Sequence, residues 1–170
     1  MPQAFVTNLS DNTRQQMIGL LNDRLADAIH LKLAVKQAHW NIKGPGFIGI
    51  HELLDDVADR LEEGIDTIAE RCVILGGNAE GTLAAVSSNS TLEPYPIDAQ
   101  DQHMHVAALR DRYMALGGKL REAIDAAGDA GDEDTADLFT EISRFVDKDA
   151  WFIGAHNADV PSNEGTSSVS

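Results

Sequence analysis

The sequence between His39 and Glu70, HWNIKGPGFIGIHELLDDVADRLEEGIDTIAE, contains a Gly/Pro-rich break followed by a long amphipathic segment. After the break, apolar residues recur every three or four positions, which predicts a helix with one buried face. These residues are Phe47, Ile50, Leu54, Val57, Leu61, Ile65 and Ile68. At about 100° per residue, a second stripe lies on the flank of the apolar one and consists of His51, Asp55, Asp66 and Glu70. This stripe carries residue types that bind metal ions.

The stripe contains two pairs that are too far apart to bind one ion within a single chain. Asp66 lies eleven positions after Asp55, or about 16 Å along the axis at a rise of about 1.5 Å per residue. Metal bonds to oxygen or nitrogen span only about 2–2.5 Å. A second copy of the helix, antiparallel about a two-fold axis, would bring His51 and Asp55 opposite Asp66 and Glu70. The spacing therefore predicts a site shared by two subunits.

Composition predicts one folded domain over residues 1–170, with flexible tails at 1–9 and 160–170. The chain has 170 residues, of which 43% are hydrophobic and 24% charged, with few aromatic residues, and this favours helices over sheet. The single cysteine, Cys72, predicts neither a disulfide within the chain nor a thiolate cluster, and we expect it to be buried. The sequence predicts no signal peptide and no membrane span, so the cytoplasm is the default location.

Hydrophobic periodicity predicts an all-α fold, a four-helix bundle. Ser10 and Asn12 are the candidate N-caps of the first helix. The Gly117-Gly118 pair inside the third long helix predicts close helix packing. A crossover over 78–96 connects the second and third helices and carries a short helix near 82–86. The four long helices are expected at 13–39, 47–75, 99–127 and 133–157.

Carboxylates and imidazoles without sulfur favour Fe(II), Zn(II) or Mn(II), with open positions for water or oxygen. Taken singly, each of these residues is more often a solvated helix residue than a ligand. The joint arrangement, with His39 arriving from the adjacent helix end, favours a metal site. Glu-x-x-His pairs, which supply the ligands of many di-iron bundles, do not occur in this sequence. Their absence favours the shared site.

The same residues resemble the signature of the Dps family, the miniferritins also called DNA-binding proteins from starved cells. The resemblance extends from about Ser10 to Asn157 and includes the crossover with Pro94-Tyr95-Pro96. Its other positions are His39-Trp40-Asn41, Gly44, Phe47, His51, Asp55, Asp66, Glu70, Asp147-Lys148 and Trp151.

This resemblance implies a ferritin-like fold in a hollow homo-dodecamer, with ferroxidase centres at its two-fold interfaces. It implies that His39, His51 and Asp55 come from one chain and Asp66 and Glu70 from its partner. Fe(II) would be oxidised by hydrogen peroxide or oxygen and stored as ferric mineral, which protects against oxidative stress. Zinc is an expected competitor, and Glu62 is a candidate to complete the site.

Other residues have both a structural and a functional interpretation. Trp40 is either a packing aromatic at an interface or, by resemblance, an electron donor near the iron centre. The acids that open the last helix either complement its dipole or, by resemblance, line three-fold pores. The pore candidates are Asp137, Asp132 and Glu133. His103 and His105 are expected to be surface histidines.

DNA binding is doubtful. The formal net charge is −15, and neither residues 1–12 nor the residues after Trp151 contain Lys or Arg. Such a chain should repel phosphate backbones unless a divalent cation bridges them. One alternative remains a nucleoid-associated protein that shields DNA with little iron chemistry. Another is a bundle without metal chemistry, in which His39→Ala plus Asp55→Ala would leave iron oxidation unchanged.

Overall fold

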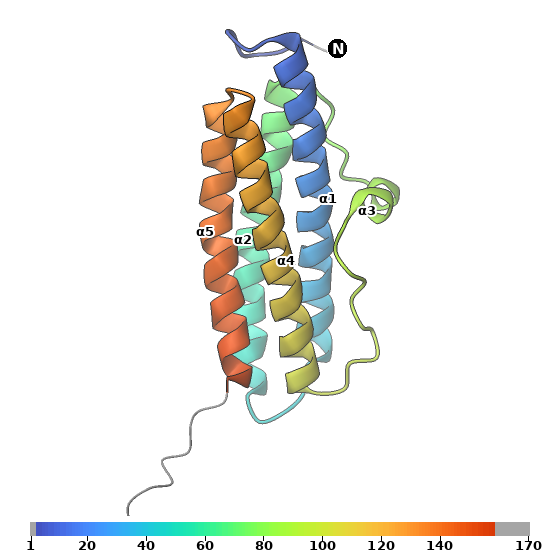
Figure 1. Ribbon diagram of the computed structural model, residues 1–170. Helices are drawn as coiled ribbons and strands as arrows, with labels where there is room; N and C mark the ends of the chain where they lie inside the picture. Colours follow the sequence, from blue (N-terminus) through green and yellow to red (C-terminus); the bar gives the residue numbers. More distant parts are fainter. Residues whose placement is uncertain (1–2, 159–170) are drawn as a thin grey trace, which may run out of the picture.

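A computed structural model describes residues 3–158, and within that range the chain is helical without strands. Four long helices form the bundle in Figure 1: α1 (Asp11–Asn41), α2 (Phe47–Ile74), α4 (Gln102–Asp129) and α5 (Glu133–Gly154). The short helix α3 (Leu83–Asn89) lies beside α1 on the crossover, and a turn of 3-10 helix (Ala155–Asn157) follows α5. The predicted four-helix bundle with its long crossover is confirmed.

Local sequence explains where the helices begin. Ser10, one of the two predicted N-cap candidates, caps α1 by accepting a hydrogen bond from the Thr13 backbone N–H at 3.0 Å. The other candidate, Asn12, lies inside α1, which begins at Asp11 and not near Thr13. Asp101 caps α4 in the same way through the Met104 N–H, so that α4 begins at Gln102 rather than near Ala99. The start predicted from the hydrophobic pattern was early because the pattern does not register the capping residue.

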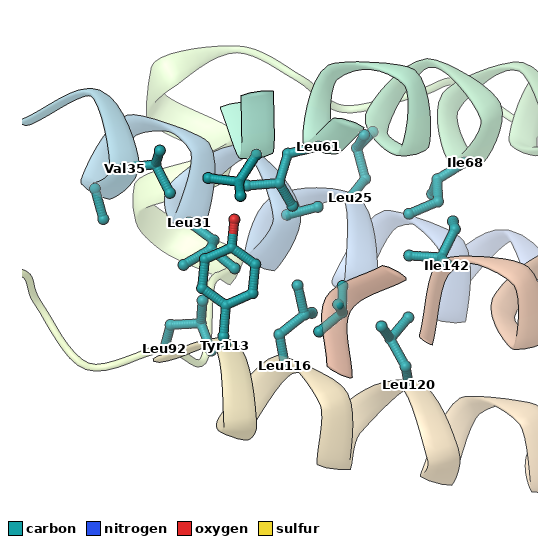
Figure 2. Close-up of a cluster of buried hydrophobic side chains, with 14 of the residues drawn as sticks. Leu25, Leu31, Val35, Leu61, Ile68, Leu92, Tyr113, Leu116, Leu120 and Ile142 are labelled. Carbon is teal, nitrogen blue, oxygen red and sulfur yellow. The ribbon is translucent and has the colours of Figure 1, made fainter. Parts of the chain in front are cut away.

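The core runs the length of the bundle and is built mostly from Leu, Ile, Val and Ala side chains. Tyr113 projects from α4 into this core, and its hydroxyl lies among apolar side chains (Figure 2). Within the described residues that hydroxyl has no hydrogen-bond partner, and burial raises the pKa of Tyr113 well above its usual value. Cys72 is buried, as expected.

The crossover is fastened to α1 by one buried carboxylate. Asp27 is fully buried and accepts hydrogen bonds from the Thr91 backbone N–H at 2.6 Å and from the Ser90 hydroxyl at 3.1 Å. Arg24, also on α1, lies 3.0 Å from the other carboxylate oxygen. A buried charge with several donors holds its partners in place, so the crossover follows a defined path along α1.

The described part of the N-terminal segment lies against one end of the bundle. The Phe5 backbone N–H donates to the Ile74 carbonyl at 2.9 Å, and Val6 and Leu9 pack partly buried against the core. The flexibility of residues 1–9 thus stays a prediction, and Phe5, Val6 and Leu9 within this range contact the bundle. The tail predicted over 160–170 lies outside the described residues.

Candidate metal centre

His39, in the last turn of α1, and His51, in the first turn of α2, lie face to face across the break between the helices. Their rings stack with centroids 3.8 Å apart at 21°. Each Nδ1 lies 3.0 Å from the backbone carbonyl oxygen of the other histidine. A carbonyl can only accept, so each Nδ1 is the donor in these hydrogen bonds, and Nε2 is the ring nitrogen left to bind a metal ion.

The loop between these helices is fixed by the first residue of α4. The Gln102 backbone N–H donates to the Lys43 carbonyl at 3.0 Å, and the Gln102 side-chain oxygen accepts from the Gly46 N–H at 2.8 Å. Gly44 has φ +141°, which strongly favours glycine, and a Cβ on Gly46 would lie 2.7 Å from Gln102 Oε1. The Gly-Pro-Gly break therefore sets the distance between the two histidines.

Asp55 completes a group of three candidate ligands one turn further along α2. One ligand atom from each of His39, His51 and Asp55 lies within 4.8 Å of the other two. Asp55 Oδ1 is 3.4 Å from His39 Nδ1, which is a second acceptor favouring the same tautomer. The donor set of nitrogen and carboxylate oxygen without sulfur fits Fe(II), Zn(II) or Mn(II).

Lys36 on α1 holds Asp55 in place. Its Nζ donates to Asp55 Oδ1 at 2.7 Å. This hydrogen bond, with smaller contributions from the nearby His39 and His51, lowers the pKa of Asp55. The carboxylate is thus charged at neutral pH, but an incoming ion must displace an ammonium group. Lys36 was not among the residues predicted for this site, although it lies one helical turn before His39.

Asp66 and Glu70 are not brought to this group. Both are exposed on the same flank of α2, and in residues 3–158 neither side chain forms a hydrogen bond or an ion pair. Glu62, the candidate for completing the site, instead pairs with Lys32 on α1. Within residues 3–158 the chain therefore presents a cluster of three candidate ligands and, further along the same helix, two acids without partners.

Trp40 follows His39 and points outward, with 69% of its surface exposed. The Lys36 Nζ lies 5.9 Å from the centre of its ring. A large exposed aromatic beside the ligand group is typical of an interface residue. Its role as electron donor stays a prediction.

The acids at the start of α5 do not all have the same role. Asp132 is only 2% exposed, caps α5 through the Thr135 N–H at 3.1 Å, and accepts from Arg71 at 2.7 Å. A helix N-terminus needs such acceptors, so Asp132 is committed to this end of the bundle and is not free to line a pore. Glu133 and Asp137 are exposed. They remain the pore candidates.

The expectation that His105 lies on the surface was wrong. His105 is 1% exposed, and its Nδ1 lies 2.5 Å from the Tyr95 hydroxyl on the crossover. Its position on the inner side of α4 buries it beneath the crossover, and this burial lowers its pKa. The residue spacing placed His103 and His105 on different faces, but it did not show which face the crossover covers.

No helix within residues 3–158 has the length and apolar character needed to cross a lipid bilayer.

Comparisons with known proteins agree with this architecture. A ferritin-like domain family matches residues 18–162. The DNA protection during starvation protein of Agrobacterium fabrum is 50% identical over 149 residues, covering 88% of this chain and 92% of that protein. The protein of the same name from Mycolicibacterium smegmatis is 31% identical over 156 residues, or 92% of this chain and 85% of that protein.

Solved structures give the same result. DpsA14 from Streptomyces coelicolor superposes with a TM-score of 0.89 at 32% identity, over 97% of this chain and 98% of that one. The Dps structure from Mycobacterium smegmatis superposes with a TM-score of 0.89 at 30% identity, over 98% and 97% of the two chains.

Proposed function

Because this chain belongs to the Dps family of ferritin-like proteins, we propose that it oxidises Fe(II) and stores the ferric product inside a hollow homo-dodecamer. The observation that carries the proposal is the half-complete site: three converging candidate ligands in one place and, elsewhere on the same helix, two acids that have no partner among the described residues. Two antiparallel copies of α2 would combine His39, His51 and Asp55 of one chain with Asp66 and Glu70 of the other.

Iron is the substrate of this site, and the chain's residues bind and orient it. The two Nε2 lone pairs and the Asp55 carboxylate bind Fe(II) from one side, while the partner's acids bind from the other and neutralise the ion's charge. Each Fe(II) gives up one electron, and a pair of them reduces hydrogen peroxide to water. Oxygen is the alternative oxidant. The reaction consumes both ingredients of hydroxyl-radical formation.

Loss of the partner's acids is the direct test of this activity. Asp66→Ala should abolish rapid oxidation when hydrogen peroxide is added to anaerobically loaded Fe(II), read as ferric absorbance in the near ultraviolet. Asp56→Ala is the matched control, because Asp56 is an exposed acid of α2 that lies about 80° around the helix from Asp66. Intact Asp66→Ala shells that oxidise iron at the wild-type rate would place the site elsewhere.

Zinc should inhibit the same step. Zn(II) accepts nitrogen and carboxylate ligands but has no accessible redox change, so it would occupy the site without turnover. Preloading with Zn(II) should slow iron oxidation in the wild type and should have no effect on the residual rate of Asp66→Ala.

We also propose that Fe(II) enters through pores lined by Glu133 and Asp137. Both carboxylates are exposed at the start of α5, and a ring of carboxylates from neighbouring subunits would concentrate cations. Asp137→Asn should slow iron uptake at low Fe(II) concentration and low salt. Asp125→Asn, an exposed acid on α4, is the control.

The second candidate function is DNA shielding, which the names of the Agrobacterium and Mycolicibacterium relatives favour. The formal net charge of −15 per chain opposes direct binding, and the Lys- and Arg-free termini provide no basic tails. A gel-shift assay at low salt should therefore show no complex without Mg²⁺. A shift that persists in EDTA would favour the DNA-shielding function.

A further inference from the structure

Within the described residues, the helix that carries most of the candidate ligands begins without a capping side chain of its own. The N-cap position of α2 is Gly46, which has no side-chain oxygen, and the first turn of this helix contains no acidic residue. The other long helices each begin with a side-chain cap, supplied by Ser10, Asp101 and Asp132. A helix start leaves its first N–H groups without acceptors, so the start of α2 needs an acceptor from elsewhere.

Gln102, the first residue of α4, supplies that acceptor. Its Oε1 accepts from the Gly46 N–H at 2.8 Å. In a capping box the same N–H is bonded by a side chain from the first turn of the helix itself. The Gln102 backbone N–H also donates to the Lys43 carbonyl at 3.0 Å, on the other side of the break. One residue of α4 therefore holds both ends of the Gly-Pro-Gly break and caps α2 from another helix.

The start of α4 is firmly held in turn. Asp101 caps this helix. One turn after Gln102, the buried His105 lies 2.5 Å from the Tyr95 hydroxyl on the crossover. The Arg112 guanidinium lies 5.3 Å from the centre of the Tyr95 ring. A side chain can position another element only when its own backbone is fixed, and these contacts fix the backbone of Gln102.

The two histidines of the candidate metal centre depend on the break for their separation. Ile42 is buried, but residues 43–45 are exposed, so most of the break has no packing of its own. A small shift of the first turn of α2 would pull the stacked rings of His39 and His51 apart. Each ligand atom must come within about 2.0–2.2 Å of an ion, so such a shift would weaken metal binding.

We propose that Gln102 is a positioning residue for the metal centre. Its amide oxygen caps α2 from α4 and thereby holds His51 and Asp55 within reach of an ion bound by His39. Gln102 acts through the backbone of the break and does not bind the ion. The inference rests on the proposed function for the identity of the site, and it adds a third helix to those that determine how tightly the site binds metal.

Two substitutions separate the hydrogen bond from the size of the side chain. Gln102→Met keeps the length of the side chain and replaces the amide by a thioether, which is a weak acceptor. Gln102→Glu keeps an oxygen that accepts from the Gly46 N–H. Gln100→Met is the matched control, because Gln100 is exposed on the crossover and its amide donates to the Asp98 carbonyl at 2.9 Å.

The Zn(II) affinity of the iron-free protein, measured by calorimetry, is the first measurement. Loss of a group that orients metal ligands weakens binding by about 10–100-fold, and we expect the lower end, about tenfold, for Gln102→Met because it acts through the backbone. Gln102→Glu and Gln100→Met should bind Zn(II) like the wild type.

Hydrogen–deuterium exchange of the metal-free protein, read by mass spectrometry, is the second measurement. Gln102→Met should speed exchange over residues 43–50, and Gln102→Glu should restore the wild-type rate. A purely structural role would lower the unfolding temperature and leave the Zn(II) affinity unchanged. Wild-type affinity or wild-type exchange in Gln102→Met would overturn the proposal, as would a Gln102→Glu variant that restores neither.

His39→Ala distinguishes failure of this inference from failure of the proposed function. If His39→Ala weakens Zn(II) binding and Gln102→Met does not, the metal site stands and the role of Gln102 is wrong. If His39→Ala binds Zn(II) like the wild type, the ion binds elsewhere, and both the proposed site and this inference are wrong.

Discussion

At the proposed metal site, Lys36 is expected to determine how readily an ion binds. Its ammonium group occupies the position beside Asp55 that a cation would take, at 2.7 Å from the carboxylate oxygen. The pair is partly exposed, so its contribution is modest and weakens with salt. At the proposed site, Lys36 is therefore expected to compete with the metal without blocking it.

Removing this competitor should tighten metal binding. Lys36→Met keeps the aliphatic stem and removes the charge, and we expect a gain in Zn(II) affinity of about fivefold or less. Anaerobic calorimetry at low salt is the measurement. Lys43→Met is the control, because Lys43 is exposed on the loop between α1 and α2. Weaker binding by Lys36→Met would show that the lysine organises Asp55 for the ion and does not compete with it.

The clustering of His39, His51 and Asp55 could be predicted because they lie near the ends of two successive helices joined by a short break. Spacing within a helix fixes which residues share a face. It does not show contacts between helices, so Lys36, the reciprocal bonds of His39 and His51, and the burial of Asp132 could not be predicted. Each of these depends on how a neighbouring helix packs.

At the scale of elements, the Gly117-Gly118 pair of α4 shows what packing adds to a sequence pattern. A Cβ on Gly117 would lie 2.9 Å from Asp147 Oδ1 on α5, so close packing was predicted correctly there. A Cβ on Gly118 would meet nothing within 4 Å. An added methyl group would therefore crowd Asp147 at Gly117 but would meet no neighbour at Gly118.

Gly118→Ala should increase the free energy of unfolding by about 0.5–1 kcal/mol, because alanine loses less backbone entropy than glycine in a helix. Gly117→Ala should gain less, since the Asp147–Arg121 ion pair must move aside. Guanidinium unfolding of both variants gives the comparison. An equal gain in unfolding free energy for both variants would show that the close approach of Asp147 does not destabilise Gly117→Ala.

The crossover packs on α4 through a histidine that responds to pH. Burial lowers the pKa of His105 below its usual value near 6.5, so the unfolded chain takes up this proton first as the pH falls. His105 therefore makes its full contribution to the stability of the fold above about pH 6.5. Stability should be lost as the pH falls from about 6.5 towards the folded-state pKa.

His105→Gln should flatten this pH dependence, which for one group has a slope of at most about 1.4 kcal/mol per pH unit. Glutamine still offers an oxygen to the Tyr95 hydroxyl. The test is to measure the free energy of unfolding between about pH 7 and about pH 5. The exposed His156→Gln is the control. The same slope in wild type and His105→Gln would assign the pH dependence to other groups.

At the scale of the whole molecule, the chain is a bundle whose ligand stripe faces outward. Helix periodicity and the long crossover were sufficient to predict the bundle, because both depend on local sequence. The outward stripe was also predicted, since it lies on the flank of the apolar face. The pairing of two copies could be inferred only from the distance between the two pairs of candidate ligands along the helix, because a single chain does not contain its own partner.

Complementation between two inactive chains tests the shared site most directly. Asp55→Ala and Asp66→Ala should each abolish rapid iron oxidation when expressed alone. In a dimer of one Asp55→Ala chain and one Asp66→Ala chain, one of the two sites is complete. It combines the intact His39, His51 and Asp55 of one chain with the intact Asp66 and Glu70 of the other. With random pairing, coexpressed shells should recover about a quarter of the wild-type oxidation rate. Shells that contain both chains and yet oxidise iron no faster than either variant alone would show that the ligands lie within one chain.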